Sequence, residues 1–225
     1  MAKNYKPSSS LLLGHIELTK TQKTFFETMI MPSTRVVFLR GPAGSSKTFL
    51  ATYTALTLLN KNPDTKILYL RSVIESASQS LGFLKGDMDD KFGPYMAPLD
   101  DKIDELLTGY EKDSLKRKNS LEAQPINFQR GQSWRDKVVI IDEAQNMTKA
   151  ELTTLLTRIG RETKVFVCGD TMQSDIRSND FARMCDLFDG GDCRNKGIFN
   201  FTFSKKDIMR DKILSFIIDK IEKSD

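Results

Sequence analysis

Residues 35–48 read RVVFLRGPAGSSKT, and this stretch decides the fold that we expect for the chain. The apolar run 36–39 is too short for a helix and starts with β-branched residues, which favours a parallel strand buried on both faces. Glycine and proline end this strand at 41–44, and an apolar pattern at helical spacing follows Thr48. The N-terminus of a helix attracts anions, because its first N–H groups lack partners within the helix and its dipole is positive there. The stretch therefore predicts a loop that binds phosphate.

The loop follows the Walker A pattern G-x-x-x-x-G-K-[ST], in which the lysine reaches the β- and γ-phosphates and the hydroxyl binds magnesium. Gly41, Lys47 and Thr48 match this pattern, whereas Ser46 replaces its second glycine. A Cβ at that position crowds the backbone that must approach the phosphates, and it is strained where φ is positive. The alternative is a Gly- and Ser-rich connection between an ordinary strand and helix. The residues expected to bind nucleotide here are Gly41, Pro42, Ala43, Gly44, Ser45, Ser46, Lys47, Thr48 and Phe49.

A second stretch, 137–143, reads KVVIIDE and completes the predicted site. Its four apolar residues indicate a buried strand that ends in Asp142 and Glu143, as in a Walker B motif. In open parallel sheets, ligands bind beyond the carboxyl ends of the strands, so this pair and the phosphate loop should meet at one edge. Asp142 would then hold magnesium, directly or through water, and Glu143 would orient and deprotonate the attacking water. The alternative for such a pair is an ordinary polar end of a strand.

Alternating strands and helices predict a doubly wound α/β sheet, predominantly parallel, with helices on both faces. Further strands are expected at 66–71, 125–130, 163–168 and 197–203, and a closing helix is expected after Ser204. We expect a flexible N-terminal arm at 1–17 and a single domain at 18–225. We interpret a polar excursion near 109–124 as a solvated surface helix, with a strand-binding insertion as the alternative.

Composition limits the class of protein. The 225 residues carry a net charge of +4 with 28% charged side chains, which permits nucleic acid as a partner without requiring it. The three cysteines are an odd number in a chain without a secretory signal, which favours reduced thiols and a cytoplasmic location. The single histidine, His15, argues against a zinc site. No apolar run reaches the roughly 20 residues that span a bilayer, so we expect no membrane partner.

Two glutamines are further candidates for the site. Gln22 lies upstream of the phosphate loop, where many nucleic-acid-dependent ATPases place a glutamine against adenine. The equal alternative is a solvated glutamine on the face of a helix whose N-cap is Thr19. Gln173 follows the end of a predicted strand, and its amide would sense the γ-phosphate through a hydrogen bond.

Four short motifs together resemble those of the PhoH-like ATPases, relatives of the superfamily 1 helicases. They are GPAG at 41–44, DEAQN at 142–146, LTRIG at 156–160 and GDTMQ at 169–173. LGFL at 81–84 and the pairs at 94–95, 98–99 and 130–131 also fit, so the resemblance covers residues 18–210. Ser46, Ser72, Lys85 and Gln132 stand where the family has glycine, proline, proline and arginine. A divergent member, such as a phage protein, would show this pattern.

The resemblance implies a RecA-like core, ATP and magnesium as ligands, and a role in the metabolism of RNA or single-stranded nucleic acid. Phosphoryl transfer gains roughly 10³ to 10⁵ in rate from an arginine finger. The candidates are Arg158 and Arg210, and Arg210 matches the family's C-terminal D-x-x-R pattern through Asp207. A surface salt bridge is the alternative for each.

Two functions of different classes follow from these observations. The leading one is a magnesium-dependent ATPase coupled to single-stranded RNA or DNA, in the host cytoplasm if the protein is phage-encoded. A superfamily 1 helicase closes two such domains around ATP, whereas this chain has room for one. We therefore expect a homo-oligomer, such as a ring, to supply the missing wall and the arginine finger. The alternative, motivated by Ser46, is a nucleotide-dependent switch or adaptor with little turnover; a small-molecule kinase fits the motifs less well.

Overall fold

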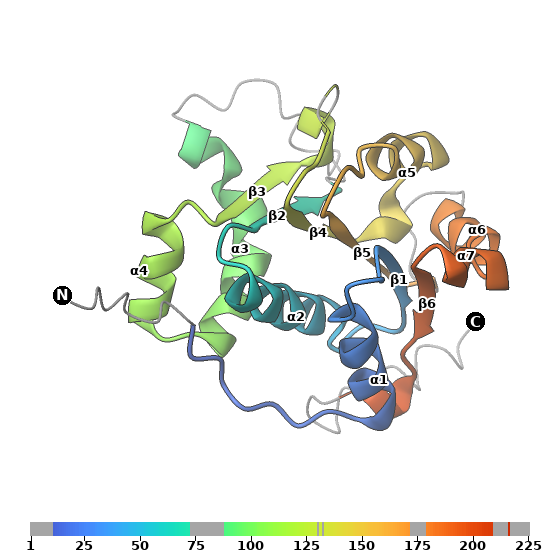
Figure 1. The fold of residues 1–225 in the computed structure, drawn as a ribbon, viewed down its shortest axis with the longest axis horizontal. Coiled ribbons are helices and arrows are strands. Elements are labelled where there is room, and N and C mark those ends of the chain that lie inside the picture. Colours follow the sequence, from blue (N-terminus) through green and yellow to red (C-terminus); the bar gives the residue numbers. More distant parts are fainter. Residues whose placement is uncertain are drawn as a thin grey trace, which may run out of the picture.

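A six-stranded sheet lies at the centre of the molecule, with the strand order β3-β2-β4-β5-β1-β6 (Figure 1). The computed structural model describes residues 11–72, 88–129, 131, 133–171, 179–208 and 216. All five pairs of neighbouring strands are parallel. The strands are β1 (Val36–Arg40), β2 (Lys66–Arg71), β3 (Leu121–Pro125), β4 (Lys137–Asp142), β5 (Lys164–Gly169) and β6 (Ile198–Thr202). This topology confirms the predicted α/β fold of RecA-like type.

Helices cover both faces of the sheet, as the sequence predicts. They are α1 (Lys20–Met29), α2 (Lys47–Lys61), α3 (Met88–Leu106), α4 (Gly109–Arg117), α5 (Lys149–Leu156), α6 (Asp180–Leu187) and α7 (Gly191–Asn195), with short 3₁₀ helices η1 (Ile126–Gln129), η2 (Ala144–Asn146) and η3 (Lys205–Asp207). Phe25 of α1 and Leu56 of α2 belong to the core on one face, whereas Leu152 of α5 and Phe181 of α6 belong to the core on the other. In the part of the chain that the structure describes, every helix is too short or too polar to cross a lipid bilayer.

The edge strand β3 lies earlier in the chain than predicted. The strand expected at 125–130 is the 3₁₀ helix η1 over most of its length, and the strand itself occupies the end of the polar excursion. Its sequence, LEAQP, lacks an apolar run because β3 pairs with β2 on one side only. The helix expected in the excursion is α4, although its Glu111 and Leu115 are buried rather than solvated.

The register of the central strands brings their carboxyl ends to one edge of the sheet. Arg40, the last residue of β1, pairs with Gly169 of β5, and Arg71 of β2 pairs with Asp142 of β4. The loop after β1 and the acidic end of β4 therefore face the same space, as ligand-binding segments of open parallel sheets do.

The N-terminal segment 11–18 runs along the helical layer to this edge. Leu11 is 8% exposed. The side chain of Asn60, near the end of α2, accepts a hydrogen bond from Leu11 N at 2.7 Å and donates one to Leu11 O at 2.9 Å. This pair of bonds fixes the segment at one end, so that its other end reaches the site described next.

Candidate nucleotide-binding site

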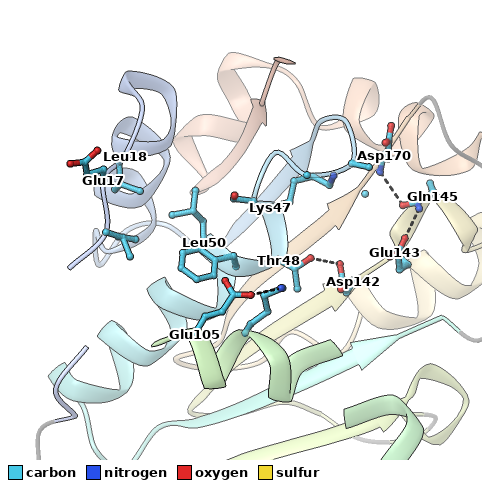
Figure 2. A pocket seen from close by; sticks show the side chains of 17 residues that line it. Glu17, Leu18, Lys47, Thr48, Leu50, Glu105, Asp142, Glu143, Gln145 and Asp170 are labelled. Atoms are coloured by element: carbon cyan, nitrogen blue, oxygen red, sulfur yellow. Dashed lines mark hydrogen bonds and ion pairs between the residues drawn. The ribbon is translucent and has the colours of Figure 1, made fainter. Parts of the chain in front are cut away.

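A cavity of about 470 Å³ opens at the carboxyl ends of β1, β4 and β5 (Figure 2). Figure 2 shows Glu17 and Leu18 at one end of the cavity and Glu143 and Gln145 at the other. Its lining comes from five parts of the chain: Ile16, Glu17 and Leu18; Ala43, Gly44, Ser46, Lys47, Thr48, Phe49 and Leu50; Lys102 and Glu105; Asp142, Glu143 and Gln145; and Gly169 and Asp170. The structure thus brings the two stretches that the sequence singled out to one cavity.

The backbone of the phosphate loop is strained at Ser46, because this residue has the positive φ at which a Cβ is unfavourable. Ser46 has φ 64° and ψ 25°, a left-handed conformation, and it is the N-cap of α2 without a side-chain hydrogen bond to that helix. Gly44 is also left-handed, with φ 77°. Gly41 has a different requirement, because a Cβ there would lie 2.9 Å from both the Cβ and the carbonyl oxygen of Phe203. Only glycine fits at 41, whereas serine occupies position 46 at a cost in backbone strain.

The Lys47 side chain folds back onto the phosphate loop and binds its backbone. Its ammonium group donates hydrogen bonds to the carbonyl oxygens of Gly41 at 2.7 Å and Pro42 at 2.9 Å. Burial lowers the pKa of Lys47 below its usual value, and the nearby carboxylates of Asp170 and Asp142 oppose that shift. A partly desolvated cation at this position is well placed to exchange its two carbonyl partners for phosphate oxygens.

The side chains of Thr48 and Asp142, the two residues predicted to bind magnesium, are in contact at the cavity. The Thr48 hydroxyl donates a hydrogen bond to Asp142 Oδ1 at 2.8 Å (Figure 2). The other oxygen, Oδ2, accepts a hydrogen bond from the Tyr69 hydroxyl at 2.7 Å. Burial and the Asp142 charge raise the pKa of Tyr69, so its hydroxyl stays a neutral donor. A hydroxyl beside an oriented carboxylate is the hard-oxygen donor set that Mg²⁺ prefers, so these residues fit that ion.

Glu143 lies next to this pair and has partners of its own. Its backbone is left-handed, with φ 54° and ψ 39°. Its Oε2 accepts a hydrogen bond from Gln145 Nε2 at 2.6 Å, and the side-chain oxygen of the same amide, Gln145 Oε1, accepts one from Asp170 N at 2.9 Å (Figure 2). Its Oε1 lies 3.6 Å from a guanidinium nitrogen of Arg71. The carboxylate therefore faces the cavity from a fixed turn.

Gln22 contacts the N-cap of α1 and the backbone of η3. It is fully buried, so the solvated alternative is wrong, and it does not line the cavity. Its amide accepts a hydrogen bond from Thr19 N at 3.0 Å and donates one to the carbonyl oxygen of Asp207 at 2.9 Å. Thr19 is the N-cap of α1, as predicted, and shares a capping box with Gln22. A contact between Gln22 and adenine stays a prediction.

The remaining predicted residues are not brought to the cavity by the described part of the chain. Arg158 follows α5, and its carbonyl oxygen accepts a hydrogen bond from Trp134 N near the start of β4, at the opposite edge of the sheet. Gln173, Arg210 and the motif at 81–84 lie outside the described residues.

Sequence reasoning missed several residues that line the cavity or contact its carboxylates. Ile16, Glu17 and Leu18 line it but carry no motif. Tyr69 and Arg71 come from a strand that the sequence identified only by its apolar run. A phenol in a buried strand usually finds a hydrogen-bond partner, which is the one signal that could have singled out Tyr69.

A parallel α/β sheet whose first strand ends in a phosphate loop, facing a carboxylate pair, defines a P-loop NTPase domain. A family model described as "PhoH-like protein" matches residues 16–222, and the chain belongs to this family. It is 34% identical over 191 residues to a PhoH-like protein of Bacillus subtilis, an alignment that covers 84% of this chain and 58% of the relative. It is 37% identical over 147 residues to Protein PhoH of Escherichia coli K12, an alignment that covers 64% of this chain and 41% of the relative.

The chain spans about half the length of the curated relatives that it matches. Among solved structures, the Pif1 helicase from Candida albicans aligns with 91% of this chain and 44% of its own, at a TM-score of 0.41 and 15% identity.

Proposed function

We propose that this domain binds ATP with Mg²⁺ and hydrolyses it, and that single-stranded RNA or DNA stimulates the turnover. The observation that carries the proposal is the contact between Thr48 and Asp142, 2.8 Å apart, with Glu143 beside them in a cavity that the phosphate loop lines. This arrangement supports the proposal, because it would hold two ligands of one Mg²⁺ and a general base beside the γ-phosphate of a loop-bound nucleotide.

Each side chain then has a defined task. Lys47 binds phosphate oxygens in place of the loop carbonyls, and Thr48 and Asp142 hold the magnesium ion, which offsets phosphate charge. Glu143 accepts a proton from the attacking water as that oxygen bonds to the γ-phosphorus and the bond to the β–γ bridging oxygen breaks. Apolar surface for the adenine ring of ATP is available at the other end of the cavity, from Ile16, Leu18, Phe49 and Leu50.

The finer parts of the proposal rest on the sequence. Gln173 would sense the γ-phosphate, Arg210 would act as an arginine finger, and Gln22 would contact adenine. Coupling to single-stranded nucleic acid is supported by the motif resemblance and the mildly basic charge, and a homo-oligomer, such as a ring, would provide a finger in trans. The cytoplasm is the location that the reduced cysteines favour.

A second function, a nucleotide-dependent switch with little turnover, is favoured by one observation. Ser46 places a Cβ in the left-handed turn beside the cavity, where the usual pattern has glycine. A loop that binds nucleotide but positions it less well would cycle slowly and act through its bound state.

Steady-state ATP hydrolysis by the purified protein tests the proposal, with Mg²⁺ or EDTA and with or without single-stranded RNA or DNA. Lys47→Ala is the inactive variant, and Lys61→Ala is its matched control, because Lys61 is exposed at the far end of the same helix. We expect magnesium-dependent turnover that is lost in Lys47→Ala, kept in Lys61→Ala and increased by one polymer. ATP binding without lysine-dependent turnover would favour the switch instead.

A further inference from the structure

Arg71 is the last residue of β2, and its position relates it to the proposed base. It pairs in register with Asp142, the residue before Glu143. Its guanidinium group lies 3.6 Å from Glu143 Oε1, with the Arg71 side chain 32% and the Glu143 side chain 39% exposed. Arg71 itself does not line the cavity, whereas Glu143 does. The arginine therefore contacts the base without reaching the space for nucleotide.

Glu143 needs such a partner because little else fixes its carboxylate. The left-handed backbone sets where its Cβ points, but a half-exposed side chain can still rotate. Gln145 holds one oxygen, Oε2, and is itself held by the backbone of Asp170. The other oxygen faces Arg71, so the carboxylate is held from two strands, β2 on one side and β5 on the other.

The same end of β2 contacts the turn after Glu143 a second time. The Ser72 hydroxyl donates a hydrogen bond to the carbonyl oxygen of Asn146 at 3.1 Å. Arg71, the last residue of β2, and Ser72, which follows it, thus contact both ends of the 143–146 turn. Ion pairs as exposed as this one contribute little to folding stability, so stability does not account for the contact between Arg71 and Glu143.

We propose that Arg71 is a positioning residue for Glu143. It holds Oε1 so that the carboxylate is directed at the water beside the γ-phosphate. This inference rests on the proposed ATPase function. It places the effect of Arg71 in the chemical step and outside nucleotide binding.

The test compares Arg71→Ala and Arg71→Lys with the wild type in kcat, KM and the affinity for a fluorescent ATP analogue. We expect Arg71→Ala to lower kcat about ten- to hundredfold, with analogue affinity unchanged, and Arg71→Lys to recover part of the loss. Arg194→Ala is the control, because Arg194 forms an exposed ion pair with Asp189, with 3.4 Å between the charged atoms, and neither residue lines the cavity. Its kcat should equal that of the wild type.

A double-mutant cycle with Glu143→Gln shows whether Arg71 acts through Glu143. In single-turnover measurements, Arg71→Ala should cause no further loss once Glu143 is replaced. Losses that multiply would overturn the inference, as would an unchanged kcat in Arg71→Ala. If Arg71→Ala does not fold, Arg71→Lys and Arg71→Gln provide the same comparison. Wild-type protein without Lys47-dependent turnover would overturn the proposed function and this inference together, whereas an active wild type with an equally active Arg71→Ala overturns only the role of Arg71.

Discussion

Replacing Ser46 by glycine and by alanine tests the geometry of the phosphate loop directly. Ser46 has φ 64° and makes no capping hydrogen bond through its side chain, so alanine keeps the strained Cβ and loses no bond to α2. Glycine removes a strain of about 1–2 kcal/mol, but it returns about 0.4–1 kcal/mol of freedom to the unfolded chain. Ser46→Gly should therefore be more stable than Ser46→Ala by about 0.5–1 kcal/mol.

Urea denaturation of the nucleotide-free protein measures this difference. The control is the same pair of substitutions at Ser114, a helical residue of α4, where glycine costs about 1 kcal/mol relative to alanine. The order of the two variants should thus reverse between positions 46 and 114. If alanine is the more stable variant at both positions, the left-handed conformation at Ser46 is refuted.

The same variants separate the two candidate functions. Ser46 already adopts the backbone conformation that glycine would adopt, so the loop amides keep their directions in Ser46→Gly. We expect its ATP turnover to stay close to that of the wild type. A large gain in turnover would mean that the serine weakens the site, as the switch function supposes.

Three further predictions concern residues around the cavity. Tyr69→Phe removes a buried donor to Asp142 and should lower the free energy of unfolding by about 1.5–3 kcal/mol in urea titrations; a loss below about 0.5 kcal/mol would contradict the hydrogen bond. Gly169→Ala places a Cβ 2.6 Å from Phe181 Cε1, and should cost about 1–3 kcal/mol in the same assay unless the ring moves freely. Lys47 has a lowered pKa in the folded state, so the unfolded chain binds more protons as pH approaches 10.5, and stability should rise with pH. The free energy of unfolding, measured by denaturation at about pH 8 and about pH 10, should rise more in the wild type than in Lys47→Met. An equal change in both proteins would contradict the prediction.

The central strands could be identified from the sequence because each carries its own apolar run. The runs at 36–39 and 138–141 are apolar throughout because both faces and both edges of β1 and β4 are covered. The edge strand β3 has no such requirement, and LEAQP could be placed only once its pairing with β2 was known. Fold class was thus predictable from the apolar strands, whereas the position of the edge strand β3 was not.

The site divides in the same way. Lys47 and Thr48 were predicted from their spacing after Gly41, and Asp142 was predicted from its place at the end of an apolar strand. Tyr69 and Arg71 reach Asp142 and Glu143 from the neighbouring strand, and their positions depend on the register between β2 and β4. No local pattern encodes that register, because it is set by packing across the whole sheet.

The N-terminal segment 11–18 also determines how the molecule would respond to mechanical force. Its start is fastened to Asn60 by two hydrogen bonds through Leu11, and its end forms one wall of the cavity. A pull on the N-terminus is therefore resisted by the bonds of Leu11 to Asn60, and then by those of Leu12 to Glu111 and Gly14 to Leu106, before it reaches Ile16 and Leu18. Stretching would detach residues 16–18 from the cavity. A bound nucleotide analogue in contact with these residues would therefore raise the force at which the segment detaches.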